Sequence, residues 1–192
     1  MAIIQKNTVA NGFERFHLSD FRAVKTPLAE EVIKQLLAKL THVQDLELSF
    51  LSKQPRDLRN QLLDFAAEVI KQHQAPITDL SFWDFLGWGE DTSLSDRKLV
   101  RALCESKETQ IQNLNLGFNH GWWKDNVLRG PLVQFVVSQT QLSTLNIQGV
   151  NLTSDETIDV LKCLCKNAAT IRDINAEFCF NFSEDESCKL VC

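Results

Sequence analysis

The side chains of this sequence that could do chemistry are its acids, four histidines and six cysteines. Catalysis would need a nucleophile beside a base, and a metal ion would need three or four ligands at a regular spacing. His17, His42, His73 and His120 lie far apart along the chain and form no ligand cluster. The sequence has no glycine-rich phosphate loop, no G-x-S-x-G elbow and no H-E-x-x-H motif. We therefore expect no catalytic residues, no metal, no cofactor and no enzymatic activity.

The cysteines predict packing and not metal binding. Cys163-x-Cys165 and Cys188-x-x-x-Cys192 are close pairs, but neither has a second pair at the spacing of a zinc site. Cys104 and Cys165 fall at equivalent places in two apolar segments, where neighbouring segments carry larger aliphatic residues. We expect both to be reduced thiols that act as small hydrophobic residues in the core.

The residue types that mediate protein recognition are more prominent than those of a catalytic or metal site, because acids and aromatic rings recur in the middle of the chain. All four tryptophans lie in two short segments, as Trp83 and Trp88 and as Trp122 and Trp123. Such rings either bind a partner or pack on one another over the end of a sheet, and both interpretations stay open. The glycines and acids around Trp88 favour an exposed loop. For Trp122 and Trp123 we expect one ring to face inward and the other outward.

A recurring pattern of apolar residues must position these side chains. The pattern Val43-x-x-Leu46-x-Leu48 returns at a spacing of 29 to 34 residues between its central anchors. Its other copies are Ile77-x-x-Leu80-x-Phe82, Ile111-x-x-Leu114-x-Leu116, Leu142-x-x-Leu145-x-Ile147 and Ile171-x-x-Ile174-x-Ala176, with a degenerate first copy at Phe13-x-x-Phe16-x-Leu18. A period of this length is typical of a repeated supersecondary unit.

Each unit predicts a short strand, a turn and an amphipathic helix, because the apolar period changes from two to about 3.6 within it. The expected helices are 27–40, 56–72, 95–105, 127–138, 154–166 and a last one that begins near Ser183. We expect one α/β solenoid domain over residues 1–192, with an N-terminal segment or cap at 1–12 and about six repeats over 13–192. A solenoid exposes one long face to partners.

Two copies carry a family resemblance: Ile111 to Asn119, which reads IQNLNLGFN, and Leu142 to Ile147, which reads LSTLNI. They resemble leucine-rich repeats of the ribonuclease-inhibitor-like class, and the resemblance covers about residues 13 to 192. It implies a short horseshoe with parallel strands on the concave face and helices on the convex face. The other copies depart from the family's asparagine, which stands at Asn119, because they have Phe21, Leu51, Phe85, Val150 and Cys179. We expect apolar packing to replace most of the family's asparagine ladder.

The residues between the strand anchors should face the concave surface, since side chains alternate along a strand. From the first copy to the last, these positions hold Glu14, Arg15, His17 and Ser19; Gln44, Asp45, Glu47, Ser49 and Phe50; Thr78, Asp79, Ser81, Trp83 and Asp84; Gln112, Asn113, Asn115, Gly117 and Phe118; Ser143, Thr144, Asn146 and Gln148; and Arg172, Asp173, Asn175, Glu177 and Phe178. The predicted face is acidic with interspersed aromatic rings, so a basic or cleft-bearing protein would complement it.

From this face and its loops we single out twelve partner-binding candidates. They are Asp45, Glu47, Phe50, Asp79, Trp83, Asp84, Trp88, Asn115, Phe118, Trp122, Trp123 and Glu177. The alternative for each acid is simple solvation, since exposed carboxylates mostly contact water.

Composition and charge narrow the partner class. The net charge of -5 and the scattered basic residues argue against nucleic acid, which needs clustered Lys and Arg. No apolar run reaches the roughly 20 residues that cross a bilayer, and the N-terminus lacks the pattern of a secretory signal. We expect a cytoplasmic protein that is monomeric by itself and binds no membrane.

The resemblance implies protein binding, because repeats of this class commonly bind proteins and include enzyme inhibitors. The degenerate, Phe-rich copies also look like small leucine-rich-repeat effectors of intracellular bacteria, which would place the chain in a host cytosol with a host protein or another effector as its partner. One alternative is regulation of a GTPase, for which Arg15, Arg172, Asn113 and Asn115 are the concave candidates. Another is a structural or recognition fragment of a larger repeat array.

Overall fold

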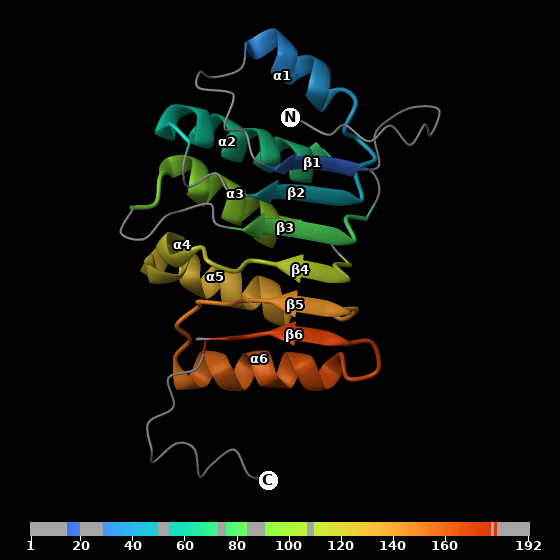
Figure 1. The fold of residues 1–192 in the computed structure, drawn as a ribbon, viewed down its shortest axis with the longest axis vertical. Coiled ribbons are helices and arrows are strands. Elements are labelled where there is room, and N and C mark those ends of the chain that lie inside the picture. Colours follow the sequence, from blue (N-terminus) through green and yellow to red (C-terminus); the bar gives the residue numbers. More distant parts are fainter. Residues whose placement is uncertain are drawn as a thin grey trace.

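The computed structural model describes residues 15–19, 29–49, 54–72, 76–83, 91–106, 110–177 and 179. They form an α/β fold in which six parallel strands follow one another through a single sheet in chain order. Figure 1 shows this succession along the longest axis of the molecule. The strands are β1 (Arg15–Ser19), β2 (Asp45–Ser49), β3 (Asp79–Trp83), β4 (Asn113–Asn115), β5 (Thr144–Asn146) and β6 (Asp173–Asn175).

The helices alternate with the strands. They are α1 (Glu30–Leu37), α2 (Arg56–Gln72), α3 (Leu94–Glu105), α4 (His120–Lys124), α5 (Asn126–Val137) and α6 (Ser154–Lys166). Along one side of the sheet α2 packs beside α3, α3 beside α5, and α5 beside α6. Helix α1 has no buried residue, but Ile33, Leu36 and Leu37 pack against the edge of the core and the helix contacts α2. None of the described helices is both long and apolar enough to cross a bilayer.

The apolar pattern sets the register of the sheet. The central anchors of neighbouring copies pair directly: Phe16 with Leu46, Leu46 with Leu80, Leu80 with Leu114, Leu114 with Leu145, and Leu145 with Ile174. Five of these six side chains are buried, and Ile174 on β6 is 44% exposed. The predicted repetition of a strand and a helix is therefore confirmed for the described residues, because the five buried anchors belong to the core between the sheet and the helices.

Two of the predicted helices match the structure at both ends. The bounds of α2 and α6 are the predicted ones, 56–72 and 154–166. Thr153 and Glu156 form a capping box at the start of α6, and Ser93 and Asp96 form another at the start of α3. Helix α1 starts at Glu30, after an extended Ala29, and not at the predicted residue 27. The predicted helix near Ser183 lies outside the described residues.

The asparagine position of the repeat is more polar than predicted. Buried Asn119 donates its side-chain amide to the carbonyls of Phe82 and Leu116. At the same position of the last copy, the buried Cys179 thiol lies 2.6 Å from the Ile147 carbonyl, the counterpart of the Phe82 carbonyl. Cys179 therefore provides the hydrogen bond that apolar packing was expected to replace. Val150 has no side-chain donor, and it is buried as predicted.

Candidate functional site

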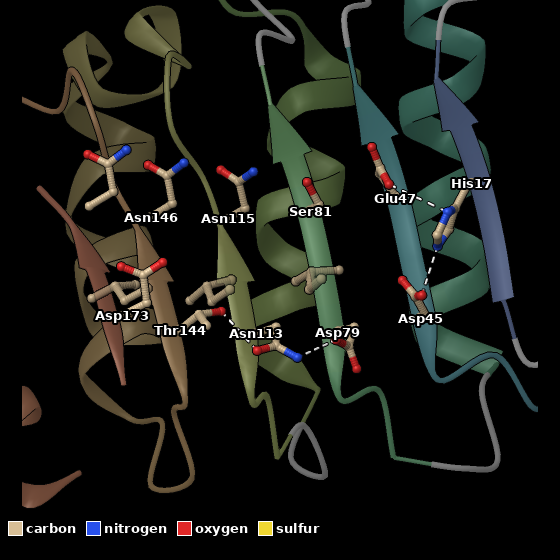
Figure 2. Close-up of a pocket in the computed structure, with 14 residues that line it drawn as sticks. His17, Asp45, Glu47, Asp79, Ser81, Asn113, Asn115, Thr144, Asn146 and Asp173 are labelled. Atoms are coloured by element: carbon tan, nitrogen blue, oxygen red, sulfur yellow. Dashed lines mark hydrogen bonds and ion pairs between the residues drawn. The ribbon is translucent and has the colours of Figure 1, made fainter. Parts of the chain in front are cut away.

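Polar side chains cover the face of the sheet that points away from the helices. Every second strand residue projects there, because the residues between them are the buried anchors. Figure 2 shows these side chains side by side on all six strands. We call this surface the open face; its central hollow has a volume of about 410 Å³ and is lined by His17, Asp45, Glu47, Asp79, Leu80, Ser81, Asn113, Leu114, Asn115, Thr144, Leu145, Asn146, Asp173 and Asn175.

At the first two strands, two predicted acids share one histidine. His17 Nε2 lies 2.8 Å from Asp45 Oδ2, and His17 Nδ1 lies 3.5 Å from Glu47 Oε2. Arg15 Nε is 3.8 Å from the same Asp45 oxygen, and the Ser49 hydroxyl donates to Glu47 over 2.8 Å. The structure thus brings Asp45 and Glu47 together, and neighbouring groups hold both carboxylates in fixed positions.

Asp79 begins a polar chain that crosses three strands. It accepts a hydrogen bond from the Thr78 hydroxyl at 2.7 Å and another from the Asn113 amide. Asn113 in turn accepts from the Thr144 hydroxyl at 2.9 Å. Among the described residues, no cationic group lies within ion-pair distance of Asp79 or of Asp173 on β6. The open face therefore carries two carboxylates without a described counter-charge, one on the central strand β3 and one on β6 at the end of the sheet.

A column of asparagines forms the next row of the open face. The side-chain oxygens of Asn115, Asn146 and Asn175 accept backbone N–H groups two residues later, at 3.2, 3.0 and 3.4 Å. This local bond fixes each side chain and leaves the amide N–H₂ groups of Asn115 and Asn146 directed over the sheet, as Figure 2 shows. A Cβ at Gly117 would lie 2.9 Å from Asn146 Oδ1, so glycine is required there for this close approach.

Two predicted aromatic residues meet where the strands end. The rings of Trp83 and Phe118 stack with centroids 5.8 Å apart and planes 24° from parallel, and both are half-buried. His120 meets the Phe118 ring edge-on at 6.2 Å. Phe118 has a backbone φ of 58°, in the left-handed region, and the equivalent residue of the next copy is Gly149 with φ 76°. We call Trp83 and Phe118 the aromatic platform.

The prediction that one ring of the Trp122–Trp123 pair faces outward is wrong. The segment forms the unpredicted helix α4, which buries both rings, to 0% and 4% exposure. The Trp122 indole N–H donates to Asp96, and the Trp123 indole N–H donates to the Leu116 carbonyl at 3.4 Å. Both tryptophans are therefore core residues here and are removed from the candidate surface.

The remaining partner-binding candidates divide into two groups. Glu177 is exposed and accepts a hydrogen bond from Gln148 at 2.7 Å, so it lies at the β6 end of the open face. Phe50, Asp84 and Trp88 lie outside the described residues. Their roles stay predictions.

Several open-face residues were part of the predicted row but were not singled out. They are His17, Asn113, Thr144, Asn146 and Asp173. Each lies one position before or after a strand anchor, so the alternation that placed Asp79 would have placed them equally well. Charge as well as alternation pointed to Asp173, whereas Asn113, Thr144 and Asn146 are uncharged and follow from alternation alone.

The prediction for Cys104 and Cys165 is wrong, since both are exposed. Among the four cysteines that the structure describes, the buried thiols are those of Cys163 and Cys179. Burial raises the pKa of both thiols and keeps them protonated, so they are poor nucleophiles. In the described ranges, no three His, Cys, Asp or Glu side chains gather in a metal-binding arrangement.

The candidates for GTPase regulation do not form a cluster. Arg15 is next to Asp45 on the first two strands, whereas exposed Arg172 precedes the last strand. Asn113 is engaged with Asp79 and Thr144. A site that orients water or a phosphate would need such groups to converge on one point.

Comparison with known proteins adds no family to this description. No protein-family model matches the chain, and no curated protein is significantly similar to it. Candidate functions therefore rest on the open face and the aromatic platform.

Proposed function

We propose that this chain is a leucine-rich-repeat module that binds a partner protein through its open face and aromatic platform and thereby inhibits or regulates that partner. The repeat family is supported by the regular succession of strand and helix, by the buried anchors, and by Asn119, whose amide donates to carbonyls of two consecutive copies. The sheet would then be the concave side of a short solenoid.

The observation that carries the proposal is the continuity of polar groups across all six strands. The open face runs from His17 on β1 to Asn175 on β6, and Trp83 is the aromatic residue among the outward positions of its described strands. A face that only supported the fold would have no need for carboxylates in its centre. Asp79 and Asp173 supply charge that no described cation compensates.

The charge of the open face predicts a basic partner. Asp45, Glu47, Asp79 and Asp173 lie on it, and Arg15 and His17 at the β1 edge already contact Asp45. Lysine or arginine side chains of a partner would pair with the carboxylates, and opposite charge would accelerate the encounter. The amides of the asparagine column add donors that fix the orientation of the bound chain.

The aromatic platform supplies the apolar part of the contact. Trp83 projects from the same face of β3 as Asp79 and Ser81, four and two residues earlier, so a partner that pairs with Asp79 also reaches the indole. Half-buried Trp and Tyr rings are frequent anchors of protein interfaces. A scaffold whose side chains are already fixed by hydrogen bonds loses little entropy on binding, which suits an inhibitor.

The first test is affinity capture with charge reversals on either side of the sheet. Asp173→Lys and Trp83→Ala alter the open face, and Asp159→Lys is the matched reversal on α6, where the carboxylate pairs with Lys162. Thermal melting of each variant verifies folding. We expect Asp173→Lys and Trp83→Ala to lose the same partner that the wild type and Asp159→Lys retain. Equal recovery by all folded variants would refute open-face binding.

The second test separates inhibition from simple tethering. The captured partner's own activity is measured with increasing amounts of wild-type chain and of Asp173→Lys. If the chain is an inhibitor, the wild-type chain reduces the partner's activity and Asp173→Lys does not. The resemblance to bacterial effectors makes a host protein or another effector the expected class of partner.

A further inference from the structure

A second hollow lies on the helical side, between α3 and α5. It has a volume of about 510 Å³ and lies beside the two most exposed large apolar side chains of the described residues, Leu94 at 70% and Val127 at 59%. Each belongs to the first turn of its helix, and neither contributes to the core. We call this hollow the α3–α5 groove.

Three residues of α5 line the groove, namely Val127, Leu128 and Pro131. Proline inside a helix is unfavourable by roughly 3 kcal/mol relative to alanine, and glycine, which precedes it as Gly130, by roughly 1 kcal/mol. A Cβ added at Gly130 would meet no atom within 4 Å, so no close packing requires glycine there. The segment that forms this side of the groove therefore has a low local helix propensity.

The charge of the groove is opposite to that of the open face. Arg97, Lys98 and Arg101 line it from α3, and Glu105 is the acid that lines it. Arg97 lies 3.5 Å from Asp125 and Lys98 lies 3.1 Å from Asp64, whereas Arg101 has no acid within ion-pair distance in the described part of the chain. The lining therefore has three basic residues against one acid, and Arg101 is the cation whose charge no described acid at ion-pair distance offsets.

We infer that the α3–α5 groove is a second docking surface, which binds a protein segment with an apolar side chain flanked by acidic residues. The apolar side chain enters the hollow between Leu94 and Val127, and the acids pair with Arg101 and its neighbours. A hollow favours an inserted side chain over a flat lipid surface, which would touch only the exposed rim. This surface is independent of the open face, so the chain can bridge a basic partner and an acidic one.

The test is selection from a phage-displayed library of random linear peptides on the immobilised full chain. Leu94→Asp and Arg101→Glu alter the groove. Ile158→Asp and Lys166→Glu are matched controls on α6, where Ile158 is also exposed. We expect enriched peptides to combine an apolar residue with flanking acids. Their affinity should fall at least about tenfold for each groove variant and stay unchanged for the controls.

Three results would overturn the inference. One is the absence of an enriched acidic and apolar class, and another is equal binding of the selected peptides to groove and control variants. In the third result, Leu94→Asp and Arg101→Glu lose a single property of the wild type. That property is either self-association, measured by sedimentation, or binding to vesicles of phosphatidylserine and phosphatidylcholine. Replacing the acids of a selected peptide by lysine should abolish its binding, because charge complementarity is the basis of the proposal.

Discussion

The indole of Trp83 stacks on the ring of Phe118 across two neighbouring copies of the repeat, and Phe118 adopts a left-handed backbone conformation at this contact. The equivalent residue of the next copy, Gly149, has the same conformation at no steric cost. Left-handed backbone costs a residue with a Cβ about 1–2 kcal/mol. Strain of this kind is typical of functional sites, and here it holds an aromatic ring beside the open face.

Replacing Phe118 separates this strain from the function of the ring. Phe118→Gly removes the stacking contact but also the strain, so we expect its free energy of unfolding to stay within about 1 kcal/mol of wild type. Phe118→Val keeps the strain with a β-branched side chain and should lose at least about 2 kcal/mol. Urea denaturation measures both. Equal destabilisation by Phe118→Gly and Phe118→Val would contradict the left-handed conformation of Phe118. Both variants, once folded, should bind the partner less tightly than wild type because they lack the aromatic ring.

Replacing Trp122 should lower the stability of the fold without reducing binding of the partner. Trp122→Phe keeps an aromatic ring but leaves buried Asp96 without the indole donor, at a cost of about 1–3 kcal/mol. Trp123→Phe is the matched control, because the Leu116 carbonyl keeps its bond from Asn119. We expect a lower denaturation midpoint for Trp122→Phe than for Trp123→Phe. Loss of partner capture by folded Trp122→Phe would show that this ring does reach the interface.

The strands and most helices could be predicted from the sequence because more than one sequence feature indicates each of them. Leu80 and Leu114 are recognised by period, and their burial sets the register of the whole sheet. Thr153 and Glu156 mark the start of α6 by capping chemistry as well as by period. The open face then follows from strand alternation alone.

The predictions fail where the same pattern of apolar residues is compatible with two different structures. In the segment His120–Lys124, aromatic residues after a strand suit a loop or a short helix equally, and α4 has no side-chain cap to distinguish them. For cysteine, a shift of two residues rotates a helix position by about 200°, so Cys163 is buried whereas Cys165 is exposed. Neither the aromatic residues nor the cysteines of these segments identify the partner protein.

Acid should weaken a contact between consecutive helices. Arg129 Nε lies 2.7 Å from Glu156 Oε1, and Thr153 N–H donates to Glu156 Oε2 at 2.8 Å. Burial alone would raise the pKa of Glu156, but the bonds from Arg129 and Thr153 outweigh it and hold the pKa below its ordinary value. A lowered pKa in the folded state stabilises the fold above the unfolded pKa of about 4.3, and this stability is lost as pH falls through the folded value.

Glu156→Gln tests this linkage. At neutral pH we expect it to lower the free energy of unfolding by about 1–3 kcal/mol, since a charged hydrogen-bond partner is lost. The difference from wild type should shrink as pH falls below about 4.3. Asp159→Asn removes an exposed acid from the same helix and should have almost no effect. A difference that persists unchanged into acid would contradict the role of the Glu156 charge.

The most direct measurement of the central proposal is photo-crosslinking from each side of the sheet. A photoreactive phenylalanine analogue replaces Ser81 in the middle of the open face in one variant and exposed Ile158 on α6 in another. We expect Ser81 to yield a covalent adduct with the captured partner, Asp173→Lys to abolish that adduct, and Ile158 to yield none. An adduct from Ile158 alone, with the partner still captured by the Ser81 variant, would contradict binding through the open face.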